Sequence, residues 1–425
     1  MNAADSPVGS VWLVPNGPLV ASAADLLIQV PSVNPGHDNI YVRNLFSGNL
    51  ALSSVPVIER ENPVGLIMRD AFLGQMARPF ATEVYGRRSC TAFMDPAPLL
   101  VDQATTISDL SALAIEIGEK VLKGGFIVTD GGNYVGYGSG FDLLRALSDL
   151  EIEKHRMLMD SINYASVIQR SFLSSSRQQL EAALDEHFLI WEPRDVVGGD
   201  CYFFQRRERG FFAAVIDCTG HGVPGAFMTL IAASSLGQAL RSTAPSDPAA
   251  VMGELNKLIK LALHQDKTGD DDRRNDSDDG LDAAFVWFDA PARHLIFAGA
   301  KIPLIIADSN GVRVIEGNRR GAGYADTDFN YSWTNRLVSL SEDTAVYIAT
   351  DGIFDQIGGN KRIALGKNRL SKFLEQSAAL SMPLQRAAVL HFLAEYQGSE
   401  DRRDDVTVLG FKVTEKLAVR FGGVN

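Results

Sequence analysis

Cysteine and histidine are scarce in this 425-residue chain, which holds three cysteines and seven histidines. Cys90, Cys201 and Cys218 are spread out and show no CxxC spacing, which argues against a disulfide scaffold and suits a reducing cytosol. The chain also lacks a cluster of His and Cys residues, so a zinc site is not expected.

Positive charge and long apolar runs are in short supply as well. The 40 Lys and Arg residues face 52 Asp and Glu residues, and the formal charge of -12 argues against binding the phosphate backbone of a nucleic acid. Apolar runs such as 211–216 and 295–300 have the length of strands and fall short of the roughly 20 residues that span a bilayer. Residues 1–10 do not resemble a secretory signal. We therefore predict a cytoplasmic protein that contacts neither nucleic acid nor membrane.

The length predicts two or three domains, and the content of 46% hydrophobic and 22% charged residues is typical of globular proteins. Residues 54–72 and 125–144 share one pattern, which is an apolar strand, a polar turn, a strand that begins with Val-Gly, and an amphipathic helix. Their spacing of about 70 residues indicates a duplicated β–β–α unit. We assign residues 1–145 to this domain.

A helical linker is predicted over residues 146–185, because Gly and Pro are absent there and apolar residues recur with loose heptad spacing. Lys154 and Ser161 interrupt that spacing, so a coiled coil and an ordinary packed helix both remain open. We expect the linker to carry a homodimer contact. The apolar positions are Leu143, Leu147, Leu150, Met157, Ile162, Ala165, Ile168 and Phe172.

Residues 186–425 are rich in predicted strands with pairs of long helices between them, which indicates an α+β sandwich covered by helices. Residues 266–282 are polar and acid-rich, and are expected to form a loop. The predicted strands are 199–205, 211–217, 283–288, 295–300, 304–307, 344–350 and 406–413, and the predicted helices are 224–241, 248–263, 369–380 and 383–396.

Acidic residues recur at the ends of these apolar strands, namely Asp200, Asp217, Asp351 and the pair Asp404 and Asp405. A carboxylate beside an apolar strand is costly unless it is paired or bound to a cation. No Lys or Arg regularly accompanies these positions, so a shared metal is the economical explanation. Oxygen ligands without His or Cys point to Mg²⁺ or Mn²⁺.

Four motifs in this region follow one another in a specific order, and together they resemble the SpoIIE-type branch of the PPM metal-dependent serine/threonine phosphatases. The resemblance covers about residues 186–415 and implies a central β-sandwich flanked by helices, with a two-metal site at one end. The motifs are 192–202 (EPRDVVGGDCY), 216–226 (IDCTGHGVPGA), 349–352 (ATDG) and 404–408 (DDVTV).

The resemblance also implies ligands for the two ions. Asp200, Asp217, Asp351 and Asp404 match the family's metal-binding aspartates, and the residue after Asp217 supplies a backbone carbonyl. That residue is Cys218, whose thiol is then not required; Asp405 is a less certain neighbour of the site.

A hydroxide that bridges two divalent cations can attack phosphorus in line, so neither a cysteine nor a serine nucleophile is needed. The resemblance implies that the substrate is phosphoserine or phosphothreonine on a small partner-switching protein, such as an anti-sigma-factor antagonist. A catalytically silent pseudophosphatase scaffold, switched by nucleotide, is the alternative; it would show a broken ligand set, whereas every expected carboxylate is present here.

The sequence leaves the roles of four nearby residues open. His221 is either an acid for the leaving oxygen or a packing residue where the helix begins, and Arg194 either binds substrate phosphate or forms a surface salt bridge. Asp282 stands where many relatives carry a hydroxyl residue, and is a candidate for a third metal or a bound water. Lys301 replaces a turn that often contains His-Pro in relatives, which leaves the local substrate contact open.

The two β–β–α units resemble a tandem CBS-domain pair, a module that commonly binds adenine nucleotides. Residues 136–142 (GYGSGFD) fit the family's ribose-contact pattern with one substitution, which points to Ser139 and Asp142. Residues 65–71 (GLIMRDA) place Met68 and Ala71 at the polar positions and depart from it. We expect at most one nucleotide site, and a purely structural or dimerising pair is the alternative.

Overall fold

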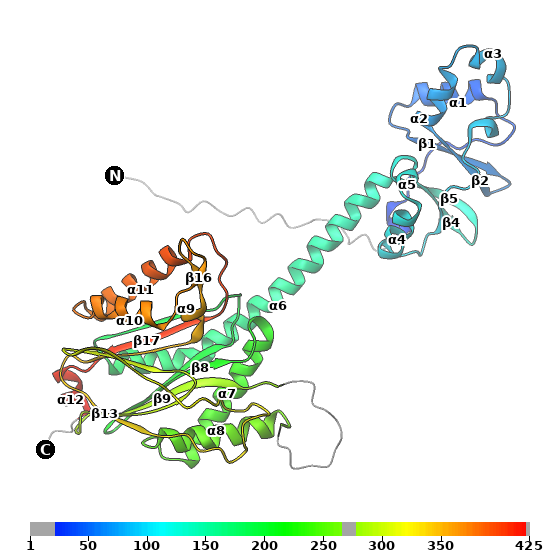
Figure 1. Cartoon of the computed structure of the whole chain (residues 1–425). Coiled ribbons are helices and arrows are strands. Elements are labelled where there is room, and N and C mark those ends of the chain that lie inside the picture. Colours follow the sequence, from blue (N-terminus) through cyan, green and yellow to red (C-terminus); the bar gives the residue numbers. More distant parts are fainter. Residues whose placement is uncertain (1–21, 266–277, 422–425) are drawn as a thin grey trace, which may run out of the picture. The chain divides into compact units, whose positions relative to one another are not determined.

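The computed structural model describes residues 22–265 and 278–421, and the chain forms two compact units, Met1–Leu158 and Met159–Asn425 (Figure 1). Most of the loop predicted over residues 266–282 lies outside the described residues, and so does the segment 1–10.

The first unit contains the predicted duplication. β1 pairs with β2 and β4 pairs with β5, both antiparallel, and each hairpin is followed by a helix. The registers shift at matching places, between Val57 and Ile58 and between Val128 and Thr129, which supports an origin of both units from one ancestor. The elements are η1 (Ala23–Leu26), α1 (Asn39–Gly48), β1 (Ser54–Glu59), β2 (Asn62–Met68), α2 (Arg69–Met76), α3 (Ala81–Tyr85), η2 (Cys90–Phe93), β3 (Leu100–Asp102), α4 (Ile107–Ile117), α5 (Glu119–Gly124), β4 (Phe126–Asp130) and β5 (Asn133–Gly138).

Helix α6 (Gly140–Ala183) runs without a break for 44 residues, and the division between the two units falls within it. In its second half the buried residues follow each other at alternating spacings of three and four, so they share one face of the helix. Ile168 and Phe172, which we placed in the predicted seam, lie off this face and are 45% and 46% exposed. The buried face consists of Ser166, Gln169, Leu173, Ser176, Leu180 and Ala183.

The second unit is built on two five-stranded sheets, with the orders β13-β10-β9-β8-β7 and β12-β11-β14-β17-β6. Its strands are β6 (His187–Glu192), β7 (Asp200–Arg207), β8 (Gly210–Cys218), β9 (Leu281–Asp289), β10 (His294–Ala300), β11 (Leu304–Asp308), β12 (Gly311–Ile315), β13 (Arg336–Ser339), β14 (Ala345–Ala349), β15 (Ile357–Gly358), β16 (Ile363–Ala364) and β17 (Val406–Lys412). Its helices are α7 (Gly222–Ser242), α8 (Pro248–Ala262), α9 (Asp351–Asp355), α10 (Lys367–Ser377), α11 (Met382–Gln397) and α12 (Glu415–Phe421).

The two sheets pack face to face, as predicted. Phe211 of β8 meets Phe411 of β17 edge to face, with 5.4 Å between the ring centroids, and one buried apolar cluster contains residues of both sheets. Figure 1 shows α7 and α8 on one side of the sheets and α10 and α11 on the other. The sequence therefore folds as a helix-covered β-sandwich, because nearly every residue of the central strands is buried.

Local signals in the sequence explain two of the covering helices. Asp247 caps α8 by accepting a hydrogen bond from the Ala250 N–H, and Pro248 occupies the first turn, as predicted. α7 is long and apolar enough by composition to cross a bilayer, but half of that stretch is buried within the folded unit. A core helix of a globular domain has the same properties.

Candidate metal centre

Three aspartates form a row across neighbouring strands at one end of the sandwich. Asp200 lies opposite Asp217 in the β7–β8 ladder, and Asp217 lies opposite Asp282 in the β8–β9 ladder. Side chains that are directly opposite each other in an antiparallel pair have Cβ atoms about 4.5–5.5 Å apart. The register of three strands therefore concentrates negative charge at this end of the sheet.

The second sheet contributes hydroxyl groups and more acids to the same end. Thr350 follows β14 and Thr407 lies in β17, and their hydroxyls donate to Asp200 Oδ2 at 2.8 and 2.7 Å. These two bonds fix the Asp200 side chain and use one of its oxygens. Asp351 begins α9 directly after Thr350, and Asp404 precedes β17, so both acids approach from the second sheet.

Burial and mutual repulsion perturb these acids strongly. Burial raises the pKa of Asp200 to about 8, although the bond from Thr407 opposes the shift. Burial also raises the pKa of Asp217 well above its usual range, and the charges of Asp200, Asp351 and Asp404 raise it further. The pKa of Asp351 is raised by burial and then by Asp404. Divalent cations would relieve both the repulsion and the burial cost.

The donor set fits hard cations such as Mg²⁺ and Mn²⁺, because the converging groups are oxygens. Within residues 22–265 and 278–421, no three His, Cys, Asp or Glu side chains are already gathered as a complete metal-binding group. The assignment of ligands therefore rests on the shared end of the strands and on the electrostatic coupling of the carboxylates.

Glycines allow the loop before β7 to approach this end. A Cβ on Gly199 would lie 2.2 Å from the Gly220 carbonyl oxygen, and one on Gly198 would lie 2.6 Å from Asp405 Oδ1. A Cβ on Gly199 would collide with backbone, whereas one on Gly198 would push the Asp405 carboxylate aside, so the two glycines serve the packing of the loop as well as the position of Asp200.

Asp405, which we predicted as a less certain metal ligand, has backbone partners on both carboxylate oxygens. Its two carboxylate oxygens accept backbone N–H groups of Arg194 and Gly199, both at 2.6 Å. This geometry gives Asp405 the role of anchoring the loop that leads into Asp200. The neighbouring Asp404 Oδ1 accepts the Asp405 N–H at 2.9 Å.

Both cysteines near the site are buried, as a small core residue would be. Contact with Cys201 and burial raise the pKa of the Cys218 thiol well above its ordinary value, so this thiol is protonated and is no nucleophile. The Cys218 backbone N–H donates to the Gly199 carbonyl at 3.0 Å, which ties the end of β8 to the Gly-Gly-Asp loop.

His221 and Arg194 lie beside the site and are partly exposed. His221 precedes the first residue of α7, and its Nδ1 lies 2.9 Å from Asp195 Oδ2. The flanking Gly220 and Gly222 have φ of 83° and 63°, which glycine adopts easily. The Arg194 guanidinium donates to the Arg403 carbonyl at 3.2 Å.

The Lys301 Nζ lies 2.9 Å from Asp282 Oδ1, so the position considered for a third metal is already paired with a cation.

Sequence reasoning missed Thr350, Thr407 and Gln169. The two threonines stand in the Thr-Asp-Gly and Asp-Asp-Val-Thr motifs, and their place beside aspartates was the available signal. Gln169 of α6 is buried; its Nε2 donates to the Gly198 carbonyl at 2.7 Å and lies 3.1 Å from the Thr229 hydroxyl of α7. Nothing in the sequence marks that contact.

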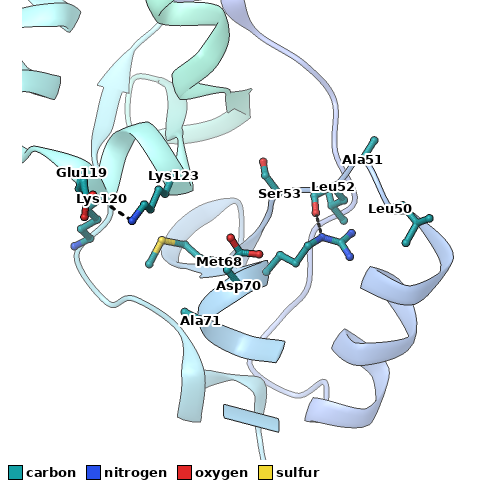
Figure 2. A pocket seen from close by; sticks show the side chains of 11 residues that line it. Leu50, Ala51, Leu52, Ser53, Met68, Asp70, Ala71, Glu119, Lys120 and Lys123 are labelled. Carbon is teal, nitrogen blue, oxygen red and sulfur yellow. Dashed lines mark hydrogen bonds and ion pairs between the residues drawn. The ribbon is translucent and has the colours of Figure 1, made fainter. Parts of the chain in front are cut away.

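In the first unit, Ser139 accepts the Phe141 N–H at 3.1 Å and so serves the first turn of α6, where Asp142 also lies. A cavity of about 550 Å³ lies elsewhere in this unit, and neither Ser139 nor Asp142 lines it. Figure 2 shows Met68 and Asp70 of the first repeat on one side of it and Lys123 of α5 on the other.

The fold is a helix-covered β-sandwich with a cluster of carboxylates at one end, and comparisons with known proteins specify its family. The family described as Stage II sporulation protein E (SpoIIE) matches residues 207–414. A solved structure, the SiaA-PP2C domain of Pseudomonas aeruginosa, is 39% identical with a TM-score of 0.55; the match covers 61% of this chain and 98% of that one. The PP2C phosphatase domain of SpoIIE from Bacillus subtilis, with a fragment of its regulatory domain, is 17% identical with a TM-score of 0.43, over 54% and 63% of the two chains. A search of curated proteins found no match.

The chain belongs to the SpoIIE-type branch of the PPM (PP2C) phosphatases. It is accordingly a metal-dependent serine/threonine protein phosphatase.

Proposed function

We propose that the protein removes phosphate from phosphoserine or phosphothreonine of a small partner-switching protein in bacterial signalling. Asp200, Asp217, Asp351 and Asp404, with the Cys218 carbonyl, are proposed to hold two Mn²⁺ or Mg²⁺ ions. The observation that carries this proposal is the cross-strand row of buried acids whose pKa values are raised by burial and by each other. Such carboxylates need cations to balance their charge, and the phosphatases of this family are metal-dependent.

The bound cations supply a hydroxide near neutral pH and offset charge on the phosphoryl oxygens. The residues of the chain hold and orient this centre. Thr350 and Thr407 fix Asp200, while Asp405 holds the Gly-Gly-Asp loop through two backbone N–H groups. His221 is held by Asp195 at the start of α7, and we propose it as the proton donor for the leaving oxygen.

A protein substrate is favoured by the surface next to His221. Val223 and Phe227, one turn apart in α7, are 38% and 64% exposed. Apolar side chains at the rim of a polar site are suited to contact another protein. A site for small phosphates alone would not need them.

The test is phosphate release by the full chain with Mn²⁺, from a phosphorylated partner protein and from an aryl phosphate. We expect Asp217→Asn to lower kcat by at least a hundredfold, because a ligand to the cations is lost. Asp289→Asn is the matched control, since Asp289 is the last residue of β9, at the opposite end of the same sheet, and pairs with Arg209 on the surface. Wild-type activity no higher than that of Asp217→Asn would favour the pseudophosphatase scaffold instead.

We further propose that the first unit regulates the phosphatase through α6, as a cytoplasmic homodimer. The apolar side chains of Ile152, Leu158, Tyr164 and Val167 are each more than 60% exposed on this helix, which supports a contact with a second copy. Sedimentation of the full chain should show a dimer that Leu158→Glu weakens. A wild-type monomer at micromolar concentration would contradict this part of the proposal.

For the first unit, adenine-nucleotide binding stays a proposal with two candidate positions, Asp142 and the cavity beside Asp70. Calorimetry on the wild type, Asp142→Ala and Asp70→Ala would separate them. Heat that disappears only in Asp70→Ala would assign the ligand to the cavity, and no heat in the wild type would leave a structural pair.

A further inference from the structure

Lys301 stands at the edge of the carboxylate row. It follows β10, and its Nζ lies 2.9 Å from Asp282 Oδ1 and 4.5 Å from the centre of the Tyr324 ring. Asp282 in turn lies opposite Asp217 in the β8–β9 ladder. The Lys301 ammonium is therefore separated from a proposed metal ligand by one side chain.

The backbone at Lys301 is strained. Its φ of 61° is in the left-handed region, which a residue with a long side chain seldom occupies. Two backbone hydrogen bonds hold it there, from Lys301 N–H to the Asn318 carbonyl and from Ile302 N–H to the Ala300 carbonyl, both 2.8 Å. Such strain persists where the surroundings enforce it, and it clusters at functional sites.

The platform under the ammonium group is rigid as well. The Tyr324 ring is wedged against two glycines, because a Cβ on Gly280 or Gly321 would lie 2.6 or 2.3 Å from ring atoms. The face of the ring and the Asp282 carboxylate therefore hold Lys301 from two sides. The Lys301 side chain is still 45% exposed, so an incoming ligand can reach it.

We propose that Lys301 binds the phosphoryl group of the substrate, and that it takes the place of a further cation at Asp282. An ammonium group has three donors, of which Asp282 needs one. A phosphoryl group that approaches the carboxylate row needs positive charge, and Lys301 provides it from a fixed position. This inference rests on the proposed phosphatase function and adds a substrate contact to it.

The first measurement is the dissociation constant of inorganic phosphate on the Mn²⁺-loaded full chain, by calorimetry, together with kcat and KM for an aryl phosphate. We expect Lys301→Gln to raise both the dissociation constant and KM about tenfold. The value of kcat should stay within about threefold, because Lys301 contacts the phosphoryl group equally in the ground state and in the transition state. Lys301→Arg, which keeps the charge, should restore both within about threefold. The control is Lys412→Gln, which removes a charge at the far end of β17 and should change neither value.

The second measurement is the number of Mn²⁺ ions bound per chain, by equilibrium dialysis. Asp282→Asn should bind as many ions as the wild type, since the Asp282 carboxylate pairs with the Lys301 ammonium and not with a metal ion. Loss of one ion in Asp282→Asn would overturn the inference, and so would unchanged phosphate affinity in Lys301→Gln. If the wild type binds inorganic phosphate but releases no phosphate from substrates, the proposed function is contradicted. The contact of Lys301 with phosphate can then still be tested through the dissociation constant.

Discussion

Asp200 shows how one residue is shaped by its surroundings. It is almost fully buried, which raises its pKa, and hydroxyls from two elements of the other sheet donate to it and oppose that rise. A buried acid with two donors and three acidic neighbours is a poor structural residue and a good ligand. The site is thus unfavourable for folding until cations bind.

This cost predicts an unusual dependence of stability on pH. The pKa of Asp200 is about 8 in the folded chain, while an unfolded Asp titrates near 3.9. Between these values the folded state binds more protons, so the free energy of unfolding of the metal-free protein should fall as the pH rises toward 8, by up to about 1.4 kcal/mol per pH unit.

Chemical unfolding between pH 6 and 8 in a chelator checks this prediction. Asp200→Asn, which cannot ionise, should flatten the slope, and saturating Mn²⁺ should do so in the wild type. A wild-type slope equal to that of Asp200→Asn would contradict the assigned shift.

The hydroxyl of Thr407 is predicted to matter for metal binding rather than for folding alone. Thr407→Val removes one of the two bonds to Asp200 and should lower kcat/KM about tenfold, which corresponds to roughly 1.4 kcal/mol, within the range of a hydrogen bond to a charged group. The Mn²⁺ affinity, measured by calorimetry, should fall as well.

Thr407→Ser should keep most of the activity because it keeps the hydroxyl. Thr344→Val is the matched control. Thr344 is also buried, but it precedes β14, at the end of this strand away from Asp200, and its hydroxyl forms a hydrogen bond with the Ser341 hydroxyl. Equal losses in Thr407→Val and Thr344→Val would indicate a general packing effect.

Among the helices, α6 contacts the loop before Asp200 through the side chain of Gln169. Gln169 both donates to the Gly198 carbonyl and accepts the Gly198 N–H, at 2.7 and 3.3 Å. Gly198 and Gly199 lead directly into Asp200, so a shift of the helix along its axis would move the loop that carries this acid. The contact with Thr229 extends the link to α7.

Gln169→Leu should therefore weaken Mn²⁺ binding several-fold and lower the free energy of unfolding of the second unit by about 1–3 kcal/mol, because the groups of Gly198 lose their buried partner. Gln179→Leu, on the same helix but bonded to the Arg206 N–H away from the loop, is the matched control. Metal titration and thermal unfolding measure both effects. Normal Mn²⁺ affinity in Gln169→Leu would show that α6 does not act through this contact.

At the scale of the whole molecule, separate cores predict separate unfolding. The first unit has clusters around Phe46 and Leu110, and the second has clusters around Phe211 and Tyr347. Calorimetry of the full chain should show two transitions, of which only the transition of the second unit rises with Mn²⁺, because a ligand stabilises the unit that binds it.

Removal of the metal with a chelator should reverse that rise and leave the other transition in place. One cooperative transition, or an equal rise of both, would show that the two units unfold together.

Local periodicity and short motifs encode the β–β–α repeat, the helix-covered sandwich and the four strand-end aspartates, so these features could be predicted from the sequence. The sequence also suggested metal binding at Asp405 and Asp282, but it could not show that both carboxylates have partners within the chain. Whether a carboxylate meets a backbone N–H, a lysine or an open site depends on partners that are far away in the chain.

Tertiary contacts bring Asp405 to Gly199, more than two hundred residues earlier, pair Asp282 with Lys301, and place the hydroxyls of Thr350 and Thr407 against Asp200. The physical reason is that a strand register places residues side by side irrespective of their separation in sequence. Residue types and their local order can be interpreted segment by segment, whereas the partner of each charged group depends on the tertiary structure.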